Sequence, residues 1–443
     1  MPADIDREKS RSHNPSAPFL ATTWIGPAIG GAIVASSSTW RWAYGIWAIV
    51  LPAAFLPLGL TLLLAGRRAR KQQVVPRPPN RNVGSPPPLA VLAKTWRSID
   101  AGGALLLLLS LTLIPVPVSL VKTTPSGWQN PKVVALVAIG GMLLLMFPFW
   151  EGSRRLAPNP LVPLVLFKSR TFCVGCVIGF LYFMAFYLSI QTYFYSYLLV
   201  VRQQSPAAAG RIAQTFMFAA GVTAIVTFLA IRHAGKYKAL LVQGAFYYLL
   251  LIYFNVKESA APDARIADIV LNHLGAGMGA GVLMVSAQVG ARAAVPRKLA
   301  VAAEAVLLLF VEVGGAVGAA VSGAVWIRLV PSKLSAYLPA NVTEAHAQAI
   351  FADVVVASNY TLYPSGSPAR EAINRSYYET MHILLTIAAI LCAPLPLLSL
   401  FMKYYRFKPG GKGNGDGEND GENKADGVGR PEHNERRSST GLA

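Results

Sequence analysis

Ten apolar stretches of membrane-spanning length, the first of them short, follow one another along this chain. About 17–25 predominantly apolar residues cross the ~30 Å hydrocarbon core of a bilayer. Because a segment inside lipid must satisfy its own backbone hydrogen bonds, such stretches form helices. The sequence therefore predicts an all-α polytopic membrane protein. The stretches are residues 20–35, 43–65, 101–121, 132–150, 172–200, 211–231, 237–256, 266–291, 299–327 and 381–402.

The charged residues are few and lie mostly between the apolar stretches. Hydrophobic residues make up 53% of the chain and charged residues 14%, a balance typical of proteins built mainly from membrane helices. The formal net charge of +19 would also suit a nucleic-acid partner. The basic residues cluster beside the spans, however, as they do in membrane proteins, so we expect a lipid bilayer as the partner and no nucleic acid.

The distribution of Lys and Arg predicts which side of the membrane each loop faces. If the loop at 66–99 is cytoplasmic, the loops on its side hold 22 Lys and Arg, about twice the number in the opposite loops. Three Asn-x-Ser/Thr sequons, at Asn341, Asn359 and Asn374, fall in the segment 329–380, which the same rule places outside. Because sequons are acceptors in outward-facing loops, these asparagines are candidate glycosylation sites and agree with this orientation.

No catalytic constellation is visible in the sequence. There is no phosphate-binding loop, no nucleophile elbow and no Cys/His cluster with metal spacing, so we expect no enzyme, no cofactor and no metal site. Cys173 and Cys176 form a Cys-x-x-Cys motif inside an apolar stretch, where packing is favoured over redox chemistry. Four glycines that alternate within residues 275–281 indicate helix packing, because no strand precedes them.

A Gly-Pro-x-x-Gly-Gly run lies in the first apolar stretch. Proline bends a helix, and glycine lets a neighbouring helix approach closely. We interpret Gly26, Pro27, Gly30 and Gly31 as a packing and gating motif, with simple packing glycines as the alternative. An aromatic segment, Trp40–Ile49, follows, and its tryptophans are typical of a membrane interface.

In this order and spacing, the two segments resemble spans five and six of the 14-span transporters of the major facilitator superfamily. The first is similar to the antiporter-type motif of that superfamily, and the second resembles the fungal siderophore–iron transporter family. Later segments resemble spans nine, ten and thirteen and the end of the last outer loop of the same family. They are Phe186-Tyr187 with Tyr193–Leu198, Ala209–Ile212, Gly314–Gly318 with Ser322–Trp326 and Leu329–Pro331, and Gly366–Ile373 with Tyr377.

The resemblance implies a secondary active transporter that imports ferric siderophore complexes together with protons and leaves the iron inside its chelate. Alternating access would rock two helical halves about a cavity at the midplane. A proton-antiport efflux carrier for drugs or toxins, from the same superfamily, is the alternative. The plasma membrane is the expected location, with endosomal vesicles as the alternative.

Counting spans against the family predicts an N-terminally truncated bundle without spans one to four. A non-transporting or partner-dependent fragment is therefore a third alternative, because such a carrier needs both halves to line its cavity. We expect the following parts: a polar segment (1–17), a remnant of the N-terminal half with spans five and six (18–65), a cytoplasmic linker (66–99), an extra span pair with its cytoplasmic loop (100–171), a complete C-terminal six-helix half (172–402) with the outer loop 329–380, and a disordered cytoplasmic tail (403–443).

Five polar residues inside the spans are candidates for the transport path, since ionisable groups within a membrane are costly and often functional. We expect Glu312 and His273 to serve proton coupling or substrate contact, ahead of Glu304, Arg211 and Gln191. The alternative is a structural role in interhelical hydrogen bonds, or in an ion pair with Arg211. Family members usually carry neutral residues where the two glutamates stand, so this chain departs from the family pattern there.

Overall fold

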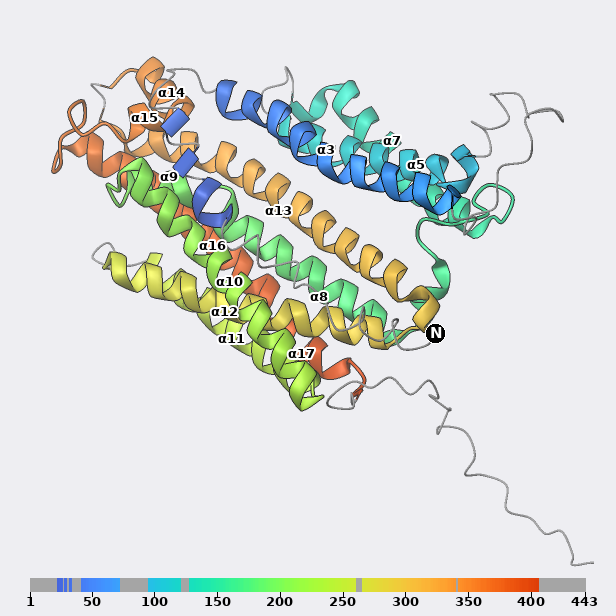
Figure 1. The fold of residues 1–443 in the computed structure, drawn as a ribbon. Helices are drawn as coiled ribbons and strands as arrows, with labels where there is room; N and C mark the ends of the chain where they lie inside the picture. Colours follow the sequence, from blue (N-terminus) through green and yellow to red (C-terminus); the bar gives the residue numbers. More distant parts are fainter. Residues whose placement is uncertain are drawn as a thin grey trace, which may run out of the picture.

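Every regular element of the computed structural model is a helix, and no β-strand occurs in the part of the chain that it describes (Figure 1). That part comprises residues 22–26, 28–29, 32–33, 41–71, 95–120, 127–259, 265–339 and 342–405. Within it, nine helices are long and apolar enough to cross a membrane. The all-α polytopic prediction is thus confirmed, while most of the first apolar stretch, 20–35, lies outside the described residues.

The helices follow the predicted order. The first three spans are α3 (Arg41–Lys71), α5 (Ala101–Leu113) with α6 (Pro115–Leu120), and α7 (Pro131–Gly152). The next is α8 (Arg170–Phe186) with α9 (Phe194–Val200), followed by α10 (Pro206–Ala234), α11 (Lys238–Ser259) and α12 (Ile266–Ala293). The last two are α13 (Ala300–Tyr337) and α16 (Pro368–Cys392), which α17 (Pro394–Phe401) extends.

Helices α8 to α13 and α16 pack into one bundle around a shared apolar core (Figure 1). The alternating glycines of α12 explain how three helices come so close. Gly277 and Gly281 face α10, where an added Cβ would lie 2.2 Å and 2.4 Å from backbone carbonyl oxygens of that helix. Gly279 faces α11, with an added Cβ 2.8 Å from the Tyr248 nitrogen. Since a spacing of two residues places glycines on two sides of a helix, one run serves both neighbours.

A second glycine seam joins α13 to α8. A Cβ added to Gly314 would lie 2.2 Å from the Phe180 carbonyl oxygen, and one added to Gly318 would lie 2.5 Å from that of Met184. Small residues allow such close backbone approach, which is the usual basis of helix association in lipid.

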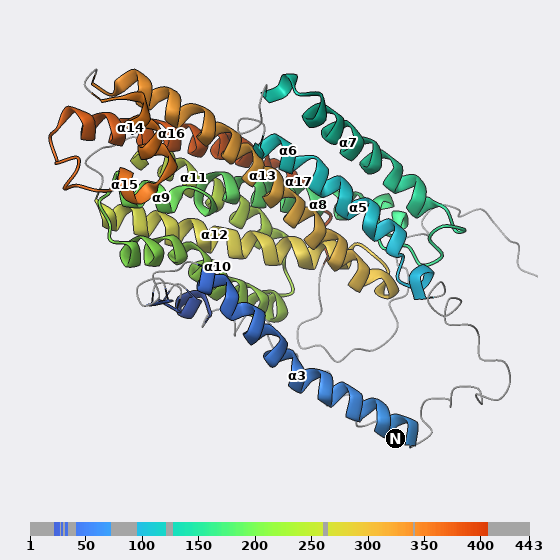
Figure 2. The same ribbon diagram turned by 90° about the horizontal axis from the view of Figure 1, so that it is seen from above.

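The first three spans lie outside this bundle. Figure 2 shows α5 and α7 side by side near α13, whereas α3 runs away from the bundle. Helix α6 contacts α13, and α5 pairs with α7. No residue in the most apolar window of α3 is buried, so this helix has almost no protein neighbour within the described part.

Two helix ends differ from the prediction. Helix α13 continues to Tyr337 instead of ending near 327, and α16 begins at Pro368 instead of 381. The segment 329–380 therefore contains several helical turns, besides α14 (Glu344–Ala352) and α15 (Val354–Ala357). Val330 and Leu334 are completely buried in the core, and this apolar packing holds the additional turns of α13.

Candidate functional site

A π-helical turn, η3 (Tyr187–Gln191), separates α8 from α9. The Thr192 hydroxyl donates to the Tyr187 carbonyl oxygen at 2.8 Å, which links the two ends of the turn. Such turns are rare and are frequent at functional sites. The predicted candidate Gln191 ends this turn with an exposed side chain.

The predicted candidate Glu312 lies on α13 next to the same turn. Glu312 and Gly315 are neighbours on one helix face, and a Cβ added to Gly315 would lie 2.9 Å from the Tyr187 ring. Tyr187 is half-buried, and Glu312 is exposed. The structure thus brings Tyr187 and Glu312 onto one surface, beside the turn that Gln191 ends, and we call this surface the Glu312 face.

The position of Glu312 restricts what can cover this face. It follows Ala300 by twelve residues, about 18 Å along the helix and near the middle of a bilayer. The exposed residues Leu308, Glu312 and Ala316 form a single stripe. A charged side chain at the bilayer centre costs about 2.5–3.5 kcal/mol on insertion scales. The Glu312 face therefore suits an aqueous cavity or another protein surface better than lipid.

Glu304, in contrast, has a structural partner. Its carboxylate forms an ion pair with Arg292 at the end of α12, where the side chains of Glu304 and Arg292 are 19% and 54% exposed. The partner is thus Arg292 and not Arg211, whose exposed side chain lies in the second turn of α10. An ion pair with this exposure contributes no more than about 1 kcal/mol.

His273 lies apart from the Glu312 face. It is completely buried in α12, its Nδ1 lies 3.0 Å from the Ile269 carbonyl oxygen, and its ring stacks on Phe194 at 4.2 Å. Its Nε2 meets no hydrogen-bond partner among the described residues.

Arg370 was not among the candidates, although it is the largest fully buried side chain in the described part. Its guanidinium donates to the carbonyl oxygens of Ala357, at 2.6 Å, and Val200, and to Asn374 Oδ1 at 3.1 Å. It also lies 4.0 Å from the centre of the Tyr360 ring. Burial raises the pKa of the Tyr360 phenol, so its hydroxyl remains neutral and donates to the Val200 carbonyl oxygen at 2.9 Å.

This arrangement, which we call the Arg370 clasp, ties α16 to α15 and to the end of α9. The sequence did not predict it. An arginine in the first turn of a helix is normally unfavourable because its charge opposes the helix dipole, so a buried arginine is not expected there. Only the Ser367 side chain, which caps α16 by accepting from the Arg370 nitrogen at 3.2 Å, marks the local geometry in the sequence.

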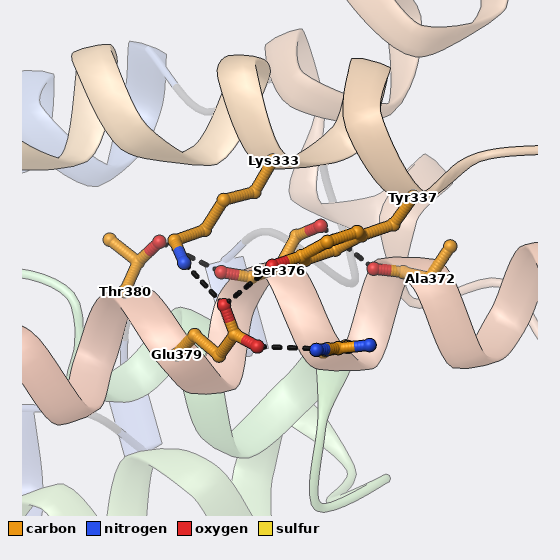
Figure 3. A network of polar contacts seen from close by, with 7 residues as sticks. Lys333, Tyr337, Ala372, Ser376, Glu379 and Thr380 are labelled. Carbon is orange, nitrogen blue, oxygen red and sulfur yellow. Dashed lines mark hydrogen bonds and ion pairs between the residues drawn. The ribbon is translucent and has the colours of Figure 1, made fainter.

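A second polar network, also unforeseen, joins α13 to α16 (Figure 3). The carboxylate of Glu379 pairs with Lys333 and accepts the Tyr337 hydroxyl at 2.9 Å. Its other oxygen accepts Arg375 Nε at 2.8 Å. Two basic residues and a phenol thus share one acid, which closes the seam between the two helices near their 329–380 ends.

The remaining candidates are placed as follows. Asn359 Oδ1 accepts the nitrogens of Thr361 and Leu362, and Asn374 holds Arg370, so both sequon amides use their oxygen within the fold and glycosylation stays a prediction. Asn341, Pro27, Gly30 and Gly31 lie outside the described residues, and Gly26 has no atom within 4 Å of an added Cβ. In the described residues, no group of three His, Cys, Asp or Glu side chains could hold a metal ion.

The chain matches no family model. It is 43% identical over 395 residues to the MFS siderochrome iron transporter C of Aspergillus fumigatus, and 42% identical over 395 residues to the siderophore iron transporter mirC of Emericella nidulans. Each match covers 88% of this chain and 63% of the relative. It is also 27% identical over 391 residues to the low affinity heme transporter str3 of Schizosaccharomyces pombe, covering 87% of this chain and 60% of that relative. With the nine apolar helices, these matches show a multi-pass membrane protein.

Proposed function

Since the chain belongs by homology to the fungal siderophore iron transporters of the major facilitator superfamily, we propose that it takes part in importing ferric siderophore complexes. The chain spans less than two thirds of the length of these relatives. We therefore assign to it one wall of the central cavity. The exposed carboxylate of Glu312 in the middle of a membrane-spanning helix is the structural observation that carries this assignment.

The Glu312 face has the chemistry that a ferric chelate requires. Such a complex presents oxygen acceptors and apolar linkers at its surface and keeps the metal inside. The Tyr187 hydroxyl and the Gln191 amide supply hydrogen-bond donors, and the Tyr187 ring supplies a flat apolar surface. The iron is carried as part of the substrate, so the protein needs no metal ligand.

Glu312 is the group we assign to proton coupling. In one half of the transport cycle it would hold a proton, and in the other it would release it. Alternating access, with rocking of helical halves about the midplane, would link this exchange to substrate movement. We place the carrier in the plasma membrane, where extracellular chelates are available.

The test is uptake of radioactive iron by iron-starved cells that lack their own siderophore carriers. Cells expressing this chain receive iron as several ferric siderophores and, separately, as heme. Uptake above the empty vector from a siderophore supports the proposal. Absence of uptake, with membrane insertion verified, refutes active import by this chain, and drug or toxin resistance in those cells would indicate the efflux alternative.

Two matched variants separate the substrate face from general structure. Glu312→Gln is expected to lower uptake at least tenfold and to remove its dependence on external pH. Glu304→Gln, eight residues earlier on the same helix, is expected to change uptake less than twofold, because Glu304 serves a half-exposed ion pair. Equal losses in both variants would contradict the assignment of Glu312.

A further inference from the structure

Two acidic side chains are buried together where α5 begins and α7 ends, outside the Glu312 face. Asp100 is 2% exposed and Glu151 is 5% exposed. Buried carboxylates are normally paired with basic residues or bound to cations. Here they meet each other, and Asp100 is the charged group that acts most strongly on Glu151.

Asp100 is held as an acceptor. It has a left-handed backbone conformation, with φ of 46°, and its side chain accepts the Gly103 nitrogen at 3.1 Å, Trp150 Nε1 at 3.0 Å and the Leu161 nitrogen at 3.4 Å. A Cβ added to Gly103 would lie 2.5 Å from the Asp100 carboxylate, so a larger residue there would displace this side chain. Three N–H groups thus point at the Asp100 carboxylate, and all three need it as an acceptor.

Glu151 is in the opposite situation. Both of its carboxyl oxygens are buried and have no hydrogen-bond partner among the described residues. The backbone nitrogens of Leu161 and Val162 point toward this carboxylate without reaching hydrogen-bond geometry. Asp100 itself can only accept, so the contact between the two side chains becomes a hydrogen bond only when one of them carries a proton.

No basic side chain neutralises the pair within the described residues. The charged residues on the segments that pack here are exposed and form no ion pair with either acid. Apolar side chains, including Phe147 and Val162, cover the region instead. Two carboxylates in contact without a counter-ion cannot both be ionised. The charged residues in question are Arg97, Arg154, Arg155 and Lys168.

We propose that Asp100 and Glu151 together bind one proton, with Glu151 as the neutral acid that donates to the ionised Asp100. The proton enters from the adjoining aqueous phase and belongs to the pair. By holding Glu151 to Asp100, it fixes the end of α7 to the start of α5 and to the segment at 161–162. This proton site is independent of the proposed transport path and does not rest on the assignment of Glu312.

Infrared spectroscopy of the purified full chain in detergent tests this directly. A protonated carboxyl group gives a C=O stretch that a carboxylate lacks. We expect this band at neutral pH, its shift when glutamate is labelled with a heavy carbon isotope, and its absence in Glu151→Gln. The band must persist in Glu304→Gln. If Glu151→Gln prevents folding, the unmodified chain still tests the proposal through the shift of the band with heavy-isotope glutamate and through its titration with pH. Absence of the band at neutral pH overturns the proposal.

Stability against pH is the second measurement. The bound proton stabilises the folded chain, so the unfolding temperature of the unmodified protein should fall as pH rises from mildly acidic to mildly alkaline values. Glu151→Gln retains an N–H donor toward Asp100 that cannot be lost, so this fall should shrink. An unchanged pH dependence would contradict the shared proton. Stabilisation of the unmodified chain by added monovalent or divalent cations at alkaline pH, without an infrared band, would show a bound metal cation instead.

Discussion

Replacing Arg370 by alanine tests whether the Arg370 clasp holds α15 and the end of α9 on α16. The substitution removes three hydrogen bonds from a charged donor, each contributing about 1.5–3 kcal/mol, and a desolvated contact with the Tyr360 ring that contributes about 2 kcal/mol. Alanine also removes the cost of burying the cation, which is several kcal/mol and offsets part of this loss. Val200 retains the Tyr360 hydroxyl, whereas the Ala357 carbonyl loses the guanidinium. The expected net loss is about 3–5 kcal/mol.

The assay is hydrogen exchange of the backbone amides of α15 together with thermal unfolding of the purified chain. Arg370→Ala is expected to accelerate exchange in α15 and to lower the unfolding temperature by several degrees. Arg370→Lys should have an exchange rate and an unfolding temperature between those of the unmodified chain and Arg370→Ala, because an ammonium cannot reach both carbonyls and stack on the ring. Arg375→Ala is the control: its side chain is 63% exposed, so its loss should leave the unfolding temperature almost unchanged. If Arg370→Ala matches this control, the reasoning fails.

Two further outcomes follow from contacts described above. Gly314→Ala should destabilise the chain by more than about 2 kcal/mol, since its Cβ would meet the Phe180 carbonyl oxygen at 2.2 Å. Gly323→Ala, with 3.7 Å to its nearest neighbour, should be tolerated. The two variants are compared by expression level and unfolding temperature. Glu304→Gln should lower stability by at most about 1 kcal/mol, and the difference should vanish in high salt because the pair with Arg292 is partly exposed; a larger loss that salt does not reduce would contradict this.

The membrane helices were predictable because the length of an apolar run and the thickness of a bilayer decide them. Helix ends were less so: the apolar stretch 299–327 suggested an end near 327, but burial of Val330 and Leu334 extends α13 to Tyr337. Side-chain packing outweighed the local signal there. The π-helical turn before Gln191 also escaped prediction, since it depends on how α8 packs against its neighbours.

The candidate site was partly predictable for a similar reason. A carboxylate inside an apolar stretch is visible in any sequence, so Glu312 and Glu304 were both found. Which of them has a partner depends on the crossing of α12 and α13, which no local pattern encodes. Arg370 escaped for the opposite reason. Its segment read as a loop, and the carbonyl oxygens that hold it come from residues 170 and 13 positions away.

The glycine run of α12 has a mechanical consequence. Where two backbones touch at glycine, no side chain is present that could change rotamer and repack. An element that switches needs two discrete packing arrangements, and such a contact offers only one. We therefore expect α10, α11 and α12 to move as one rigid body during any rocking motion. Movement would then concentrate at contacts made by long, rearrangeable side chains, such as the stack of His273 on Phe194. The glycines of α12 would in this way determine which helices move as a rigid unit and at which contacts the relative motion occurs.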